Sequence, residues 1–414
     1  AVIEREAGAR FFREVEGIRA AMAGLRDEGE AAVKRELEEC YGRLERLSPA
    51  DRRRMAAAYT LFLELMNACE NAYRGMRLAA RPLAEGGEGP ESLVYVLTAH
   101  PTEARSPANI EIFHEIQNIL SEALKPGTPS GRWKSQLTHQ LELAWRVFPT
   151  RDRAPRVKDE ADHIYHTALR PEVLGSLLRA SRERVPVYLR TWVGGDKDGH
   201  PGVDERAMLD SLRLSRGYLL RFAGSLLKEV DRSLDFLPGK KLKAERARAK
   251  SSLARLKHLK AGDGAKVSKA KEAFRKLSSA YEKEIHALHP KLEEGKRLFH
   301  VFPGLVVPLE LREASDLVME KKPQAIDRML KELASVSQGG DPLWYARGLI
   351  VSMTEKVEHL AAADERVRKA FGLPALPVIP LFETGESLSA AVEIVNGCFR
   401  HPKLGKAIRG AWGQ

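Results

Sequence analysis

The chain has 414 residues, of which 43% are hydrophobic, 30% charged and 7% aromatic, and its formal net charge is +11. It contains no run of 18 apolar residues, so a membrane span is excluded. Its first residues include acidic side chains without a long apolar segment, so we expect no secretory signal. Its three cysteines, Cys40, Cys69 and Cys398, exclude a disulfide framework and fit a reducing cytoplasm.

Residues 1–85 carry helical patterns and no strand signal. We expect them to form an N-terminal helical layer of two or three helices. The stretch at residues 82–92, with its Gly-Gly-Glu-Gly-Pro, ends the helical pattern because glycine and proline break helices. The sequence therefore predicts a change of architecture at about residue 86.

Short apolar runs then appear at wide intervals, and each is followed at once by polar residues. They lie at residues 93–98, 187–193, 305–311 and 377–382. Long helical patterns separate them, for example at residues 207–237 and 344–371. Strands separated by helices pair in parallel through crossovers, so we expect about four strands of a parallel α/β barrel.

The positive charge is concentrated in one segment. Residues 240–276 hold 14 basic residues against three acidic ones, which accounts for the whole excess of +11. Two helices around a Gly-Asp-Gly turn, with a thin leucine stripe, predict a basic helical hairpin over residues 238–290 that projects into solvent. No aromatic residues interleave with the charges to stack on bases, so we expect no nucleic-acid partner.

Each predicted strand delivers an ionisable side chain where it ends: His100, Asp196, Arg312 and Glu383. Active sites of parallel barrels lie at that end of the strands, so the four side chains predict a site, although a single histidine there is more often structural. Arginine binds carboxylates and phosphates, glutamate binds hard cations, and histidine moves protons near neutral pH. Since no glycine-rich phosphate loop occurs, the set indicates an anionic small molecule handled with a divalent metal.

Five sequence elements resemble those of the phosphoenolpyruvate carboxylase family, in the family's order. Thr98-Ala-His-Pro-Thr-Glu103 resembles the T-A-H-P-T-E signature, and Trp192-Val-Gly-Gly-Asp-Lys-Asp-Gly-His-Pro201 is similar to W-M-G-G-D-R-D-G-N-P. Leu309-Glu-Leu-Arg-Glu-Ala-Ser315 resembles L-D-I-R-Q-E-S. Val351-Ser-Met353 and Pro380-Leu-Phe-Glu-Thr384 resemble V-I-S-M and P-L-F-E-T.

The resemblance implies carboxylation of phosphoenolpyruvate by bicarbonate, giving oxaloacetate and phosphate, with Mg²⁺ or Mn²⁺. It implies that His100 stabilises carboxyphosphate and takes its proton, that Arg312 neutralises the substrate's phosphate or carboxylate, and that Glu383 binds the metal. It places Asp196, Lys197 and Asp198 near the substrate. A cytoplasmic enzyme with no membrane partner, forming a homotetramer when complete, is the expected form.

The chain departs from the family pattern at several positions. Lys197 and His200 replace the family's Arg and Asn, Glu313 replaces a Gln beside Arg312, and only Arg105 stands where the family has an arginine pair. We expect Glu313 to add a negative charge next to a site meant for anions. A lysine in place of an arginine also loses the planar fork that binds two oxygens at once.

No G-Y-S-D-S or H-G-R-G-G segment follows Glu383. With four strands where a closed barrel needs eight, residues 86–414 are expected to form the first half of a barrel with helical insertions, whose C-terminal half comes from elsewhere. The chain would then hold the N-terminal half of the active site. The alternatives are a non-catalytic or split-subunit homologue that needs a C-terminal partner and, more weakly, a nucleic-acid-binding helical protein.

Overall fold

The computed structural model describes residues 1–25, 29–81, 91–98, 105–125, 127–147, 153–183, 185–197, 202–236 and 240–412. The chain forms two compact units: Ala1–Gly86 with Arg105–Ala154, and Gly87–Ala104 with Pro155–Gln414. Residues 105–154 thus group with the N-terminal helices, whereas we expected them in the barrel half. The division at residue 85/86 into separate domains stays a prediction.

The first unit is entirely helical in its described part. Its helices are α1 (Val2–Ala7), α2 (Ala9–Gly24), α3 (Glu30–Glu45), α4 (Pro49–Ala79), α5 (Pro107–Ala123) and α6 (Ser130–Arg146). Ser48 and Ser106 cap α4 and α5 by accepting hydrogen bonds from backbone N–H groups, and a proline follows each cap. The described part of residues 1–81 holds four helices, where two or three were expected.

The second unit contains a five-stranded parallel sheet in the order β1-β2-β3-β4-β5. The strands are β1 (Leu93–Leu97), β2 (Val187–Thr191), β3 (Leu309–Ala314), β4 (Ala346–Ser352) and β5 (Val378–Pro380). The prediction of about four strands was short by one, because β4 lies inside the helical pattern expected at residues 344–371. The helical part of that pattern is limited to α15 (Val357–Phe371).

Helices connect the strands, and several of them pack on the sheet. They are α7 (Val157–Ala168), α8 (Pro171–Glu183), α9 (Glu205–Leu234), α10 (Lys240–Ala254), α11 (Asp263–Ile285), α12 (Pro290–Val301), α13 (Ser315–Met319), α14 (Ala325–Ser337), α15, α16 (Gly385–Arg400) and α17 (Pro402–Arg409), with the short 3₁₀ helix η3 (Pro342–Trp344). Mostly helical structure with a parallel sheet confirms the expected partial α/β class. None of the described helices is both long and apolar enough to span a bilayer.

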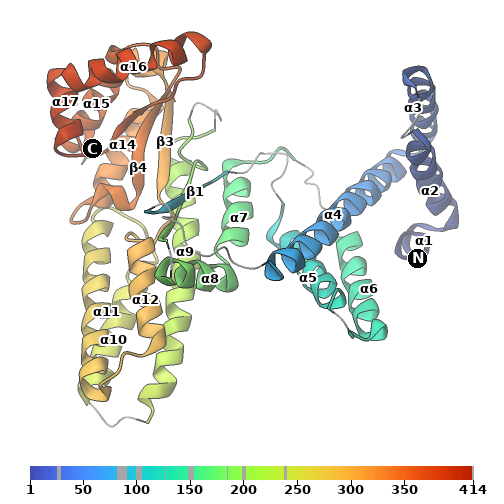
Figure 1. Cartoon of the computed structure of the whole chain (residues 1–414), viewed down its shortest axis with the longest axis horizontal. Coiled ribbons are helices and arrows are strands. Elements are labelled where there is room, and N and C mark those ends of the chain that lie inside the picture. The colour runs from blue at the N-terminus through green and yellow to red at the C-terminus, as the bar shows by residue number, and fades with distance from the viewer. Residues whose placement is uncertain are drawn as a thin grey trace. The chain divides into compact units, whose positions relative to one another are not determined.

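The basic segment contains α10 and α11, and these helices do not project alone into solvent. In Figure 1 these two helices run beside α9 and α12; α10 packs on α9, α11 packs on α12, and α9 and α12 pack on each other. Leu242, Leu256 and Leu259 of the predicted stripe are fully buried. The hairpin is therefore one part of a helical bundle, and its leucines belong to the main core.

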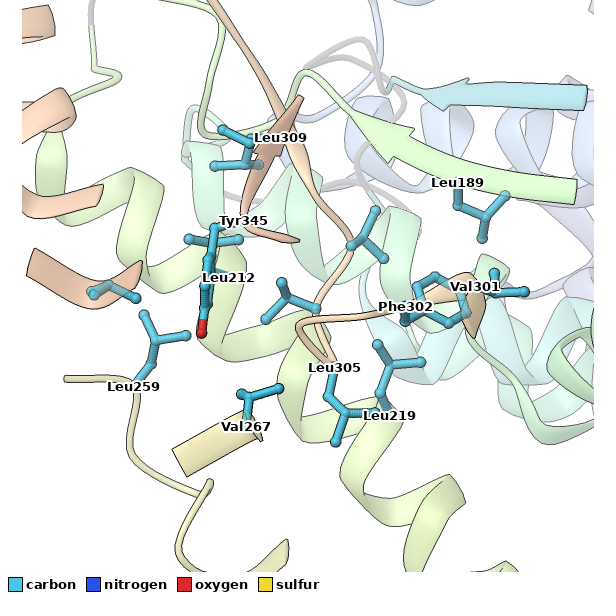
Figure 2. Close-up of a cluster of buried hydrophobic side chains, with 14 of the residues drawn as sticks. Leu189, Leu212, Leu219, Leu259, Val267, Val301, Phe302, Leu305, Leu309 and Tyr345 are labelled. Carbon is cyan, nitrogen blue, oxygen red and sulfur yellow. The ribbon is translucent and has the colours of Figure 1, made fainter. Parts of the chain in front are cut away.

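The main core of the second unit lies between the sheet and this bundle. Figure 2 shows Leu189 of β2, Leu212 and Leu219 of α9, Val267 of α11 and Leu305 before β3 in this cluster. Because strand residues alternate between faces, Leu309 and Leu311 point into the core. The intervening residues Glu310 and Arg312 face the other side of the sheet, away from this core.

Candidate active site at the carboxyl ends of the strands

Two glycines after β2 allow the chain to turn and rejoin the sheet. Gly194 has a positive φ of 87°, which favours glycine, and an added Cβ would lie 2.8 Å from the Cβ of Ser211. At Gly195 an added Cβ would lie 2.4 Å from the carbonyl oxygen of Glu310. The Gly-Gly pair thus lets β2 and β3 approach closely and brings Asp196 beside Arg312.

The backbone of Arg312 is fixed between the two residues that flank Asp196. Its N–H donates to the carbonyl of Gly195 at 2.9 Å, and its own carbonyl accepts from the N–H of Lys197 at 3.0 Å. These two bonds extend the β2–β3 pairing past the end of β2. The Arg312 side chain therefore starts from a rigid position on the sheet.

The Arg312 guanidinium lies among two carboxylates and an indole. Its Nη2 donates to Glu383 Oε1 at 2.9 Å, and its Nε lies 3.9 Å from Asp196 Oδ1. Its central carbon is 5.9 Å from the centroid of the Trp192 ring, within the range of a cation–π contact. The side chain is 16% exposed, so it is held by protein groups and still reachable from solvent.

Glu383 connects the ends of three strands. Its Oε2 accepts a hydrogen bond from the N–H of Met353 at 3.0 Å, and the carbonyl of Met353 accepts one from Ser315 Oγ at 2.9 Å. Met353 has a positive φ of 51°, which costs a non-glycine residue on the order of 1 kcal/mol or more. The strained turn after β4 is thereby fixed to the residues that follow β3 and β5.

Glu160, on the first turn of α7, was not expected from the sequence. It is buried, and burial raises the pKa of its carboxyl to about 7, with smaller contributions from the negative charges of Asp159 and Asp196. A carboxyl that titrates near neutral pH thus lies within electrostatic reach of Asp196. No sequence pattern identified it, because its burial depends on how α7 packs.

The structure brings together three of the predicted site residues, Asp196, Arg312 and Glu383. Lys197 is adjacent through its backbone. His100 and Asp198 lie outside the described residues, as does His200. The chemical roles assigned to all of these residues stay predictions.

The expectation for Glu313 was wrong. Its side chain is 1% exposed and follows Leu309 and Leu311 onto the helix-covered face of the sheet, opposite to Arg312. Its Oε1 accepts a hydrogen bond from the N–H of Ala314 at 3.2 Å. The replacement of glutamine by glutamate therefore places no negative charge on the face that carries Arg312.

The described residues do not form a ligand set for a divalent metal. Both oxygens of Glu383 already accept hydrogen bonds, from Arg312 and from Met353. Across the described part of the chain, no three His, Cys, Asp or Glu side chains gather as a metal site would require. The arrangement at the strand ends suits an anion bound by an arginine.

The chain matches known proteins of one family. The model of the phosphoenolpyruvate carboxylase family matches residues 90–300, just over half of the chain. A phosphoenolpyruvate carboxylase of Thermus thermophilus is 26% identical, over 98% of this chain and 57% of its own length. Those of Burkholderia vietnamiensis and Acinetobacter baumannii are 25% and 26% identical, over 53% and 52% of this chain.

The chain spans about a quarter of the length of the Burkholderia and Acinetobacter relatives and just over half of the Thermus one. The matched region contains β1, β2 and the Gly-Gly turn that positions Asp196, and the Thermus match extends over nearly all of the chain. The chain belongs to the phosphoenolpyruvate carboxylase family.

Proposed function

We propose that this chain carries the N-terminal half of a phosphoenolpyruvate carboxylase active site, which converts phosphoenolpyruvate and bicarbonate to oxaloacetate and phosphate. One observation carries the proposal. Arg312, the arginine of the family-like L-E-L-R segment, lies at the carboxyl ends of parallel strands and is 16% exposed beside Asp196 and Glu383. A phosphate or carboxylate of the substrate would take the place of Glu383 on the guanidinium fork.

The roles of the other residues follow from the family resemblance. His100 would stabilise carboxyphosphate and take its proton, while Asp196, Lys197 and Asp198 would line the substrate site. Glu383 would be one ligand of Mg²⁺ or Mn²⁺ once it is released from Arg312, with the remaining ligands supplied from outside the described residues. Neutralising charge where it develops on a phosphorylated enol is the chemistry this set of residues supports.

We further propose that the sheet is part of a barrel that other strands complete. Parallel strands in sequential order are typical of such barrels, and within the described part of the chain β1 and β5 each pair with one strand only. The completing half would come from a C-terminal partner, and the whole enzyme, cytoplasmic by its family, would be a homotetramer. In the alternative, the chain is a non-catalytic or split-subunit homologue that binds such a partner.

Complementation tests the proposal. The chain would be mixed with a polypeptide that carries the remaining part of the Thermus thermophilus relative, and oxaloacetate would be followed by coupled reduction to malate. We expect turnover in the mixture that is lost with Arg312→Gln and kept with Arg328→Gln, a substitution in an exposed ion pair. Two folded, associated halves without turnover would favour the non-catalytic homologue.

A further inference from the structure

The face of β2 and β3 that points away from the main core carries a polar layer beneath Arg312. Residues two apart in a strand share a face, so Arg190 and Trp192 lie on the same side as Glu310 and Arg312. Glu310 is 8% exposed, and a buried carboxylate is stable only when donors satisfy it.

Both oxygens of Glu310 accept hydrogen bonds, one from Arg190 of β2 and one from Trp192, which directly follows β2. Oε2 accepts a hydrogen bond from the indole Nε1–H of Trp192 at 2.8 Å, and Oε1 accepts one from Arg190 Nη1 at 3.1 Å. A hydrogen bond from an indole to a charged acceptor fixes the rotation of the ring, which packing alone leaves less defined. Glu310 therefore holds the indole in one orientation.

The indole in turn lies against the arginine of the site. The Arg312 guanidinium carbon is 5.9 Å from the centroid of the Trp192 ring, while Nη2 of the same side chain reaches Glu383. If the ring rotated, the guanidinium would lose this neighbour and gain freedom to move. A contact chain thus runs from Glu310 through Trp192 to Arg312.

Glu310 also offsets positive charge in the same layer. Burial lowers the pKa of Arg347, and the positive charge of Arg190 lowers it further, so these two guanidinium groups repel each other across the sheet. Glu310 binds Arg190 directly. A neutral residue at position 310 would leave Arg190 without this carboxylate and would also weaken the acceptor of the indole.

We propose that Glu310 is a positioning residue, which fixes the Trp192 indole and through it orients the Arg312 guanidinium for the anionic substrate. The inference rests on the proposed function, because it concerns the same phosphoenolpyruvate site. Glu310 itself has no role as a substrate contact, and the effect of removing it passes through Trp192.

Fluorine spectra and substrate titration on the full chain test the proposal together. The five tryptophans would be replaced by 5-fluorotryptophan, and the Trp192→Phe variant would identify the Trp192 resonance. We expect Glu310→Gln to shift or broaden that resonance alone and to weaken phosphoenolpyruvate binding about tenfold, the size of one hydrogen bond to a charged group. Glu310→Asp keeps the carboxylate and should restore most of the affinity.

If Glu310→Gln fails to fold, Trp192→Phe replaces it in the test. The phenylalanine ring fills much of the space of the indole but cannot donate a hydrogen bond to Glu310. This variant should weaken binding as Glu310→Gln does, and the double variant should be no weaker than the worse single one. Glu205→Gln, in an exposed ion pair with Arg328, is the matched control and should change neither readout.

The outcomes separate the positioning role of Glu310 from the proposed function of the chain. Binding of phosphoenolpyruvate that Glu310→Gln leaves unchanged, or an unmoved Trp192 resonance, would overturn the positioning role alone. No binding by the unsubstituted chain would overturn the proposed function, and the positioning role would fall with it.

Discussion

Two arginines of the second unit, Arg216 and Arg312, each bind a carboxylate in very different surroundings. Arg216 and Asp263 are 1% and 0% exposed, and the guanidinium donates to both oxygens of Asp263 and to backbone carbonyls of the α10–α11 turn and of the segment before β3. The side chains of Arg312 and Glu383 are 16% and 32% exposed. Glu383 also accepts a hydrogen bond from the backbone N–H of Met353, in the strained turn after β4. One pair lies in the core, and the other is open to solvent.

The difference separates a structural arginine from one that is available to a ligand. Arg216 has its donors satisfied inside the core, where it ties α9 to the N-terminus of α11 and to the segment before β3. A substrate could reach it only if the core opened. Under the proposed function, Arg312 would exchange its carboxylate for an anion without disturbing the core, so changes at Arg216 should affect stability and changes at Arg312 should affect binding.

The largest effect should come from breaking the buried pair. Asp263→Asn would leave the Arg216 guanidinium buried without its counter-charge, and we expect the free energy of unfolding to fall by about 3–5 kcal/mol. Urea unfolding followed by circular dichroism measures it. If the free energy of unfolding fell by less than about 1 kcal/mol, the size expected for an exposed ion pair, the Arg216–Asp263 pair would not be a structural element of the core.

A smaller, pH-dependent effect should appear at Glu160, near the open site. Its folded-state pKa of about 7 lies above the unfolded value of 4.5, so the folded state binds its proton more tightly and loses stability as the pH rises between these values. Glu160→Gln should therefore gain about 1–3 kcal/mol over the unsubstituted chain above pH 7, and much less at pH 4.5. A difference that does not vary with pH would contradict the raised pKa.

Removing one hydroxyl from the buried network should cost less. Tyr345 donates to Asp263 Oδ2 at 2.8 Å, and burial, followed by the charge of Asp263, raises the pKa of its hydroxyl so that it stays protonated. Tyr345→Phe should lower the free energy of unfolding by about 1–2 kcal/mol, because Arg216 still binds Asp263. Thermal unfolding of both proteins at one pH provides the measurement.

The smallest effect should come from an ion pair outside both regions. Glu205 accepts a hydrogen bond from Arg328 Nε at 3.0 Å. The side chain of Glu205 is 25% exposed and that of Arg328 is 55% exposed. Glu205→Gln should change the free energy of unfolding by less than about 1 kcal/mol, and the change should shrink in 1 M salt. A loss as large as that of Asp263→Asn would remove the distinction between buried and exposed pairs.

The sequence was sufficient to predict four of the five parallel strands and to bring Asp196, Arg312 and Glu383 to one edge, because polar residues directly after apolar runs indicate strand ends. It was not sufficient for β4, since Ala346–Ser352 is a buried strand without regular alternation that runs into a helical pattern. Strand alternation could have placed Glu313 on the core face, because Arg312 next to it faces the site. Sequence spacing does not reveal long-range partners such as Arg216 and Asp263, or Trp192 and Glu310, which depend on packing and register.

Binding of phosphoenolpyruvate to the strand ends is the claim on which the account depends. Isothermal titration of the unsubstituted chain, Arg312→Gln and the control Arg328→Gln with phosphoenolpyruvate tests it most directly. We expect the unsubstituted chain and the control to bind alike and Arg312→Gln to bind at least about tenfold more weakly, with its unfolding free energy within about 1 kcal/mol of the original. Equal binding by Arg312→Gln, or no binding by any of the three folded proteins, would contradict the account.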